Sequence, residues 1–172
     1  MLVNMKNNIK KNNNLEIEKK YLVDINDIPF NLHKYKSVKI TQAYISKNPS
    51  IRIRSLKEKY ILNIKIPTNK AYTRIENEYK ITKKTYYNLL NSIESGIIYK
   101  TRYYIPYGKY TIELDVFEKD LKGLCYAEVE FSSIKELKTF IEPNWFLKDV
   151  SKIKKYSNES LAYSIRNTQE KI

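Results

Sequence analysis

Acidic and basic side chains recur at every second position along short stretches of this 172-residue chain. Some stretches carry only one sign of charge, as in the pairs Arg52 and Arg54, Glu113 and Asp115, and Glu128 and Glu130. Paired carboxylates are typical ligands of hard divalent cations, and Arg and Lys side chains bind phosphate oxygens. Rows of both kinds together indicate a site for a metal ion and an oligophosphate.

These charges alternate with apolar residues, which is the period of a β-strand, where successive side chains point to opposite faces. The pattern predicts eight strands, over 16–23, 40–45, 51–56, 60–66, 71–81, 98–105, 110–117 and 126–131. Three helices are predicted, over 83–95 with a stop at Gly96, 134–140 and 158–165, whereas 24–35 fits either a loop or a short helix. We therefore expect a mainly β protein of the α+β class.

Two arrangements of the strands account for the charged faces. In an open antiparallel sheet, the apolar face rests on helices and the charged face meets water. In a closed barrel, the charged faces surround a wet, ligand-binding interior and the apolar faces pack against helices outside. Strand faces with one sign of charge favour the barrel, because like charges repel unless a ligand separates them.

Composition limits the other possibilities. The length fits one domain, with residues 1–14 expected to form a disordered leader rich in Lys and Asn and residues 15–172 the folded domain. One cysteine, Cys125, and one histidine, His33, exclude an internal disulfide framework and a Cys/His zinc site. No apolar run reaches the ~20 residues of a membrane span, so we expect a cytoplasmic protein with no membrane partner. The net charge of +13 favours an anionic partner.

Several of these segments together resemble the motifs of the CYTH superfamily, the triphosphate tunnel metalloenzymes. EIEKK at 16–20 is similar to the ExExK signature of that family, ITQAY at 40–44 to its IxQGY strand, and RIR at 52–54 to its RxR pair. RIENE at 74–78, KTRY at 100–103, ELDVF at 113–117 and AEVEF at 127–131 resemble further motifs. Lys65 and the terminal YSN…LA element at 156–162 also match, so the resemblance covers residues 15–165 in order.

The resemblance implies a closed eight-stranded antiparallel tunnel barrel with a few helices packed outside, which hydrolyses a triphosphate with bound Mg²⁺ or Mn²⁺. Small bacterial members with a similar pattern act on inorganic tripolyphosphate. Metal binding is thereby assigned to Glu16, Glu18, Glu76, Glu78, Asp115, Glu128 and Glu130. Phosphate binding is assigned to Lys20, Arg52, Arg54, Lys65, Arg74, Lys100 and Arg102. Tyr44 and Lys100 are assigned to assisting the attack on phosphorus: Tyr44 would orient or deprotonate the water, and the charge of Lys100 favours its tyrosinate form.

Two departures from the family pattern leave the choice of substrate open. Ala43 replaces the usual glycine of the strand motif, and Asn63 stands where threonine is common. The alternatives are a class IV adenylate cyclase, a nucleoside or thiamine triphosphatase, and a non-catalytic module that binds polyphosphate or nucleic acid. Paired carboxylates disfavour the non-catalytic module, because they repel phosphates unless a cation intervenes. We expect a small-molecule triphosphate as the partner and no nucleic acid, and a homodimer stays open.

Overall fold

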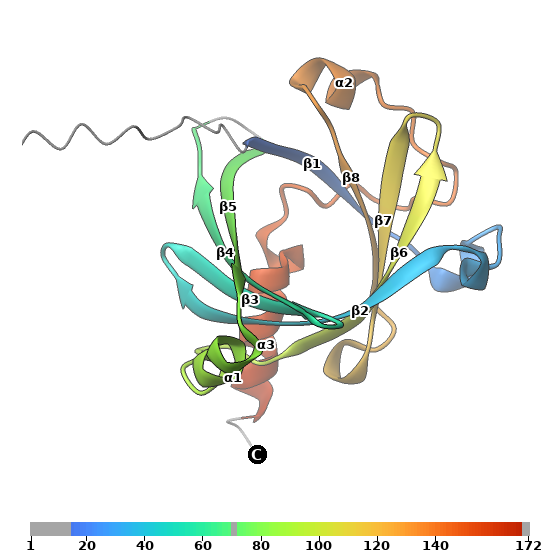
Figure 1. The fold of residues 1–172 in the computed structure, drawn as a ribbon. Helices are drawn as coiled ribbons and strands as arrows, with labels where there is room; N and C mark the ends of the chain where they lie inside the picture. Colours follow the sequence, from blue (N-terminus) through green and yellow to red (C-terminus); the bar gives the residue numbers. More distant parts are fainter. Residues whose placement is uncertain (1–14, 70–71, 170–172) are drawn as a thin grey trace, which may run out of the picture.

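The chain forms a closed antiparallel barrel in the computed structural model, which describes residues 15–69 and 72–169. The leader expected at 1–14, position 71 of a predicted strand and the last three residues lie outside the described residues. The strands are β1 (Leu15–Leu22), β2 (Lys36–Lys47), β3 (Ser50–Leu56), β4 (Lys59–Pro67), β5 (Thr73–Ile81), β6 (Ile98–Tyr107), β7 (Tyr110–Phe117) and β8 (Cys125–Glu130). Their order around the barrel is β1-β5-β4-β3-β2-β6-β7-β8, which confirms the predicted tunnel architecture (Figure 1).

The strand register brings the charged residues of neighbouring strands side by side. Lys20 of β1 lies opposite Glu128 of β8, and Glu128 lies opposite Glu113 of β7. On the next pair of strands, Arg102 of β6 lies opposite Asp115 of β7. Because opposite residues share a face, the charged faces form one continuous inner surface around the barrel. The open-sheet alternative is thereby excluded.

The helices lie outside the barrel wall or across its end: α1 (Lys83–Leu90), α2 (Ile134–Thr139) and α3 (Asn158–Gln169). Residues 24–35 form neither one loop nor one helix, but two short 3₁₀ turns, Ile25–Asp27 and Leu32–Lys34, each begun by an Asp or Asn side-chain cap. Further 3₁₀ turns are Lys119–Leu121 and Lys154–Tyr156. No helix among the described residues is long and apolar enough to span a membrane.

The first helix is shorter than the predicted 83–95. It begins as expected, with the side chain of Thr82 accepting a hydrogen bond from the backbone of Thr85. It ends at Leu90 because the following residues bond to β2 instead: Glu94 N donates to Tyr44 O at 2.9 Å, and Ser95 Oγ accepts from Tyr44 N at 2.9 Å.

Gly96 is a contact point for α3 rather than the stop of α1. Its backbone N donates to Ala162 O at 2.9 Å. A Cβ atom at this position would lie 2.5 Å from Ile165 Cγ2 and 2.6 Å from Ile165 Cβ. Such distances are far below van der Waals contact, so only glycine permits this close approach of α3 to the barrel.

The chain after α2 completes the wall beside β1. β1 pairs with β5 only over residues 15–17, and farther along the strand this edge would be left open. Residues 147–150 take the vacant place: Leu147 N donates to Leu22 O at 2.9 Å, and Val150 N donates to Lys20 O at 2.8 Å. The wall is thus closed by a segment far from β1 in the sequence.

The apolar outer face supplies the stability of the barrel. Ile53 is fully buried beneath α1, whereas Ile66 on the neighbouring strand is 42 % exposed. We expect Ile53→Ala to lower the free energy of unfolding by about 2–5 kcal/mol, because it leaves a cavity. The same change at Ile66 should cost less than about 1 kcal/mol. Urea denaturation of both variants measures the difference, and equal losses would contradict the assignment of the core.

Candidate active site

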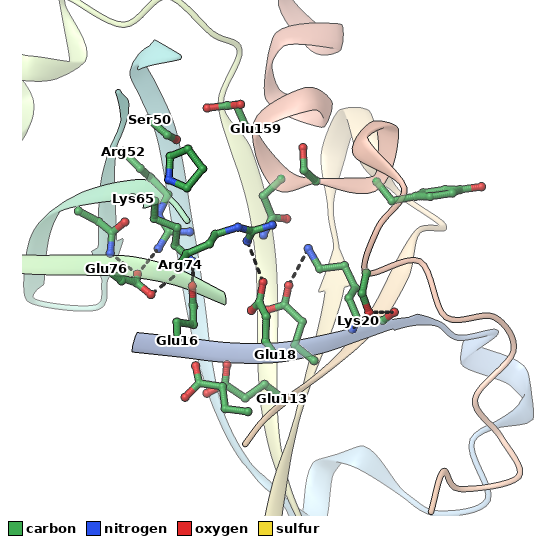
Figure 2. A pocket seen from close by; sticks show the side chains of 18 of the residues that line it. Glu16, Glu18, Lys20, Ser50, Arg52, Lys65, Arg74, Glu76, Glu113 and Glu159 are labelled. Atoms are coloured by element: carbon green, nitrogen blue, oxygen red, sulfur yellow. Dashed lines mark hydrogen bonds and ion pairs between the residues drawn. The ribbon is translucent and has the colours of Figure 1, made fainter. Parts of the chain in front are cut away.

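A cavity of about 1070 Å³ occupies the barrel interior. Among the described residues, it is lined by nine basic side chains, Lys20, Lys47, Arg52, Arg54, Lys65, Arg74, Arg102, Lys152 and Lys154, and by eight acidic ones, Glu16, Glu18, Glu76, Glu78, Glu113, Glu128, Glu130 and Glu159. Figure 2 shows side chains of β1 pointing toward those of the neighbouring strands, with Glu159 of α3 on the far side of the cavity. So many charges in one cavity suit a polyionic ligand, not an apolar one.

Aromatic rings and the C-terminal helix close one end of this interior. Phe117 and Tyr126 are buried, with ring centroids 5.2 Å apart, and together they form what we call the aromatic floor. Ala162 and Ile165 of α3 pack in the same cluster. Lys20 Nζ lies 5.4 Å from the centre of the Tyr126 ring, so cation–π attraction helps to hold this ammonium group near the floor.

A row of alternating charges continues from Lys20 across the strands. Lys20 Nζ lies 2.9 Å from Glu128 Oε1, and Arg102 Nη2 donates to Glu128 Oε2 at 2.6 Å. Arg102 Nε donates to Asp115 Oδ1 at 2.6 Å, and Lys100 Nζ donates to Asp115 Oδ2 at 2.5 Å. Burial alone would raise the pKa of Glu128, but Lys20 and Arg102 hold it well below its usual range. Burial also lowers the pKa of Lys100 to about 8, against the attraction of Asp115.

The carboxylates of β5 are held by donors from β3 and β4. Arg54 Nη2 donates to Glu78 Oε1 at 2.6 Å, and Arg52 Nη2 donates to Glu76 Oε1 at 3.4 Å. The side-chain amide of Asn63 donates to both carboxylates. A threonine hydroxyl has a single hydrogen to donate and could not bridge them in this way. The departure at Asn63 therefore links the two carboxylates.

Glu16, Glu18 and Glu130 occupy neighbouring positions on β1 and β8. Glu18 lies opposite Glu130, and Glu16 is the next residue on the same face of β1. Lys65 Nζ lies 2.7 Å from Glu16 Oε2, and Arg74 Nη1 lies 3.0 Å from Glu18 Oε1 (Figure 2). Burial, followed by repulsion from Glu18, raises the pKa of Glu16 to about 8. Its carboxyl group therefore retains a proton at neutral pH.

Carboxylate oxygens such as those of these three residues are the type of ligand that hard divalent cations prefer. No group of three or more acidic, His or Cys side chains converges at a metal-binding point within residues 15–69 and 72–169. Burial raises the pKa of Glu130, and Glu18 raises it further, which shows that like charges are crowded here. A cation bound beside these carboxylates would relieve that repulsion, although the three side chains do not converge on one point in the described residues.

All the side chains that the sequence assigns to the site line the cavity except Lys100 and Asp115. These two lie on the inner face of the barrel next to the cavity, 2 % and 0 % exposed, and bond to each other. Their expected direct contacts with phosphate and metal gain no support from this placement.

Tyr44 lines the cavity, but its ionisation differs from the expectation. Burial raises its pKa, although Arg52, Lys65 and Lys20 act in the opposite direction. Lys100 is not among the charges that act on it most strongly. In the substrate-free barrel the hydroxyl therefore stays protonated near neutral pH and can donate a hydrogen bond.

The sequence interpretation missed several lining residues. Glu113 was recognised as alternating with Asp115 on one strand face but was given no role in the site. Lys152, Lys154 and Glu159 reach the cavity from the segment that follows α2. No period-two pattern marks that segment, so the sequence held no comparable signal for them.

Comparison with known proteins finds relatives that match most of the chain, although no family model matches it. An inorganic triphosphatase of Nitrosomonas europaea is 33 % identical over 155 residues, which cover 87 % of this chain and 98 % of the relative. An inorganic triphosphatase of Acetivibrio thermocellus is 33 % identical over 149 residues, covering 85 % and 92 %.

Solved structures agree with this relationship. The crystal structure of the inorganic triphosphatase NE1496 matches with a TM-score of 0.63 and 30 % identity, over 86 % of this chain and 94 % of that one. The PH1012 protein of Pyrococcus horikoshii shares the fold, with a TM-score of 0.55 and 20 % identity over 72 % and 84 %. With the barrel and its inner charge rows in place, this chain belongs to the CYTH superfamily of triphosphate tunnel enzymes, among the inorganic triphosphatases.

Proposed function

We propose that this protein hydrolyses inorganic tripolyphosphate to pyrophosphate and phosphate with the help of bound Mg²⁺ or Mn²⁺. The observation that carries the proposal is the mixture of nine basic and eight acidic side chains in one cavity. The basic groups suit a polyanion, and the acidic groups suit the cations that accompany it. The names of the two curated relatives support the same substrate.

The ion pairs of the cavity mark the positions that substrate and cation would take. Arg54 now bonds to Glu78, and Arg74 to Glu18. When a triphosphate binds, such guanidinium groups exchange carboxylate oxygens for phosphate oxygens of similar geometry. The carboxylates released in this exchange, Glu18 and Glu78, then help Glu16 and Glu130 to hold the cation. Neither charge is left without a partner, so the exchange avoids a large desolvation penalty.

The side chains of this cavity act on the reaction chiefly through charge and position. A bound divalent cation supplies charge neutralisation of the phosphate oxygens and a lower pKa for a bound water. Arg52, Arg54 and Arg102 stabilise the negative charge that grows on the leaving pyrophosphate. The protonated hydroxyl of Tyr44 donates a hydrogen bond and orients the attacking water or the phosphate next to it.

Hydrolysis should depend on both the substrate and the cation. We expect purified protein to release phosphate from tripolyphosphate with Mg²⁺ or Mn²⁺, to release much less from ATP or thiamine triphosphate, and to release none with EDTA. A colorimetric phosphate assay measures all combinations. Equal release with and without EDTA would contradict the role of the cation, and turnover of ATP alone would indicate a nucleotide substrate.

Hydrolysis should also depend on single charges inside the cavity. Glu18→Gln and Arg54→Ala should each lower kcat/KM by about 100- to 1000-fold, because each removes a preorganised charge from the reacting phosphates. Arg54→Ala should change the free energy of unfolding by less than about 1 kcal/mol, since its partner Glu78 is 44 % exposed and reaches water.

Glu58→Gln and Lys59→Ala are the matched controls, because both residues are exposed at the turn between β3 and β4. Steady-state kinetics should show wild-type values for both controls. Wild-type kcat/KM in Glu18→Gln or Arg54→Ala would refute this assignment of the site.

The raised pKa of Glu16 should make cation binding depend on pH. Below about pH 8 this carboxyl is protonated, so a cation must displace the proton before binding. Mn²⁺ affinity should therefore rise between pH 6 and pH 8, with proton uptake by the buffer in calorimetric titrations. Glu16→Gln should bind Mn²⁺ more weakly and flatten this dependence. An unchanged slope in that variant would exclude Glu16 as the displaced acid.

A further inference from the structure

Lys100 and Asp115 form a buried ion pair on the inner face of the barrel, next to the cavity but not lining it. Lys100 is 2 % exposed and Asp115 is 0 % exposed, and neither lines the cavity. Lys100 Nζ donates to Asp115 Oδ2 at 2.5 Å. Removing one partner of a buried ion pair is costly. Because neither residue lines the cavity, the function of this pair has to be sought in its contacts with neighbouring side chains.

Asp115 accepts two hydrogen bonds from the guanidinium group of Arg102, which lines the cavity. Arg102 Nε donates to Asp115 Oδ1 at 2.6 Å, and Arg102 Nη2 donates to Asp115 Oδ2 at 2.7 Å. Two parallel bonds of this kind fix the plane of a guanidinium group as well as its position. The register supports the grip, because Arg102 and Asp115 lie opposite each other on β6 and β7.

The same guanidinium group reaches the cavity with its other edge. Arg102 Nη2 also bonds to Glu128 Oε2 at 2.6 Å, and Arg102 Nη1 bonds to Glu113. Arg102, Glu128 and Glu113 all line the cavity. One edge of Arg102 is therefore fixed by Asp115, while the other edge faces the place where a phosphate would bind.

The ionic group around Arg102 is electrically balanced. Within it, three cations, Lys20, Lys100 and Arg102, face three carboxylates, Glu113, Asp115 and Glu128. Without Lys100, these three carboxylates would exceed the two remaining cations, Lys20 and Arg102. Both oxygens of Asp115 are already bonded to basic groups, so its geometry is that of an anchor.

We propose that Lys100 and Asp115 are positioning residues: Asp115 fixes the plane of the Arg102 guanidinium toward the triphosphate, and Lys100 neutralises Asp115. Neither residue binds the metal ion or touches the substrate. The inference rests on the proposed function for its kinetic part only. It departs from the roles that the family resemblance assigns to these two positions.

The test compares Asp115→Asn with the double variant Lys100→Met, Asp115→Asn. Asp115→Asn should raise KM for tripolyphosphate and lower kcat/KM by about 100-fold, because the misplaced guanidinium loses its alignment. It should also lower Tm, since it leaves an excess of buried positive charge. The double variant restores the charge balance, so its Tm should exceed that of Asp115→Asn by about 5 °C or more. Its kcat/KM should stay low, because the two-bond grip on Arg102 is still missing.

Metal binding is measured separately, by calorimetric titration of the substrate-free protein with Mn²⁺. We expect the Kd for Mn²⁺ to stay within about twofold of wild type in both variants, and to rise at least tenfold in Glu130→Gln. The matched control is Lys109→Met, Glu136→Gln, which removes another neutral pair outside the large cavity. That control should leave KM and the Mn²⁺ affinity unchanged.

Three results would overturn the proposal. Loss of Mn²⁺ affinity in Asp115→Asn to the level of Glu130→Gln would make Asp115 a metal ligand. Recovery of kcat/KM in the double variant would show that the pair contributes charge balance and does not position Arg102. Wild-type KM and kcat in Asp115→Asn would exclude any action on Arg102. If the wild-type protein hydrolysed no triphosphate, the proposed function would fail, while the Tm and Mn²⁺ measurements would still decide whether Asp115 is an anchor or a ligand.

Discussion

Cross-strand pairing of buried ions is the constraint on which this barrel depends. An isolated charge inside a protein costs several kcal/mol, and the inner surface here carries many of them. The cost is tolerable because the most deeply buried cations lie beside carboxylates from neighbouring strands, as Lys20 lies beside Glu128 and Lys100 beside Asp115. The register of the strands therefore has to be kept: a slip of one residue would turn the inner charges outward and bring apolar side chains into the cavity.

The same pairing explains how one cavity can hold both signs of charge at high density. The substrate-free interior is close to neutral, so its groups are neither strongly repelled nor tightly fixed to a single partner. Crowding is greatest around Glu16 and Glu130, where burial and neighbouring carboxylates raise both pKa values. Asn63 acts differently, since its amide links Glu76 and Glu78 without adding charge.

Much of this arrangement could be predicted from the sequence, because alternation fixes both the strands and the face of each charge. Arg52 and Arg54 line the cavity as their spacing requires. Depth along the barrel could not be predicted, since period two does not distinguish an inward-facing residue that lines the cavity from one that is packed beside it. Asp115 and Glu113 share a face, yet only Glu113 lines the cavity. The end of α1 was also misplaced, because the bonds between Tyr44 and residues 94–95 are tertiary and leave no local signal.

The closure of the wall beside β1 has a consequence for the folding pathway. β1 pairs with β5 over residues 15–17 only, and its other partners, β8 and residues 147–150, come more than a hundred positions later in the chain. Contacts of such high sequence separation carry a large loop-closure entropy and slow the search for the native state. The hairpins from β2 to β5 can form early from local contacts. The edge of β1 meanwhile stays exposed, which makes this strand the most vulnerable to aggregation during biosynthesis.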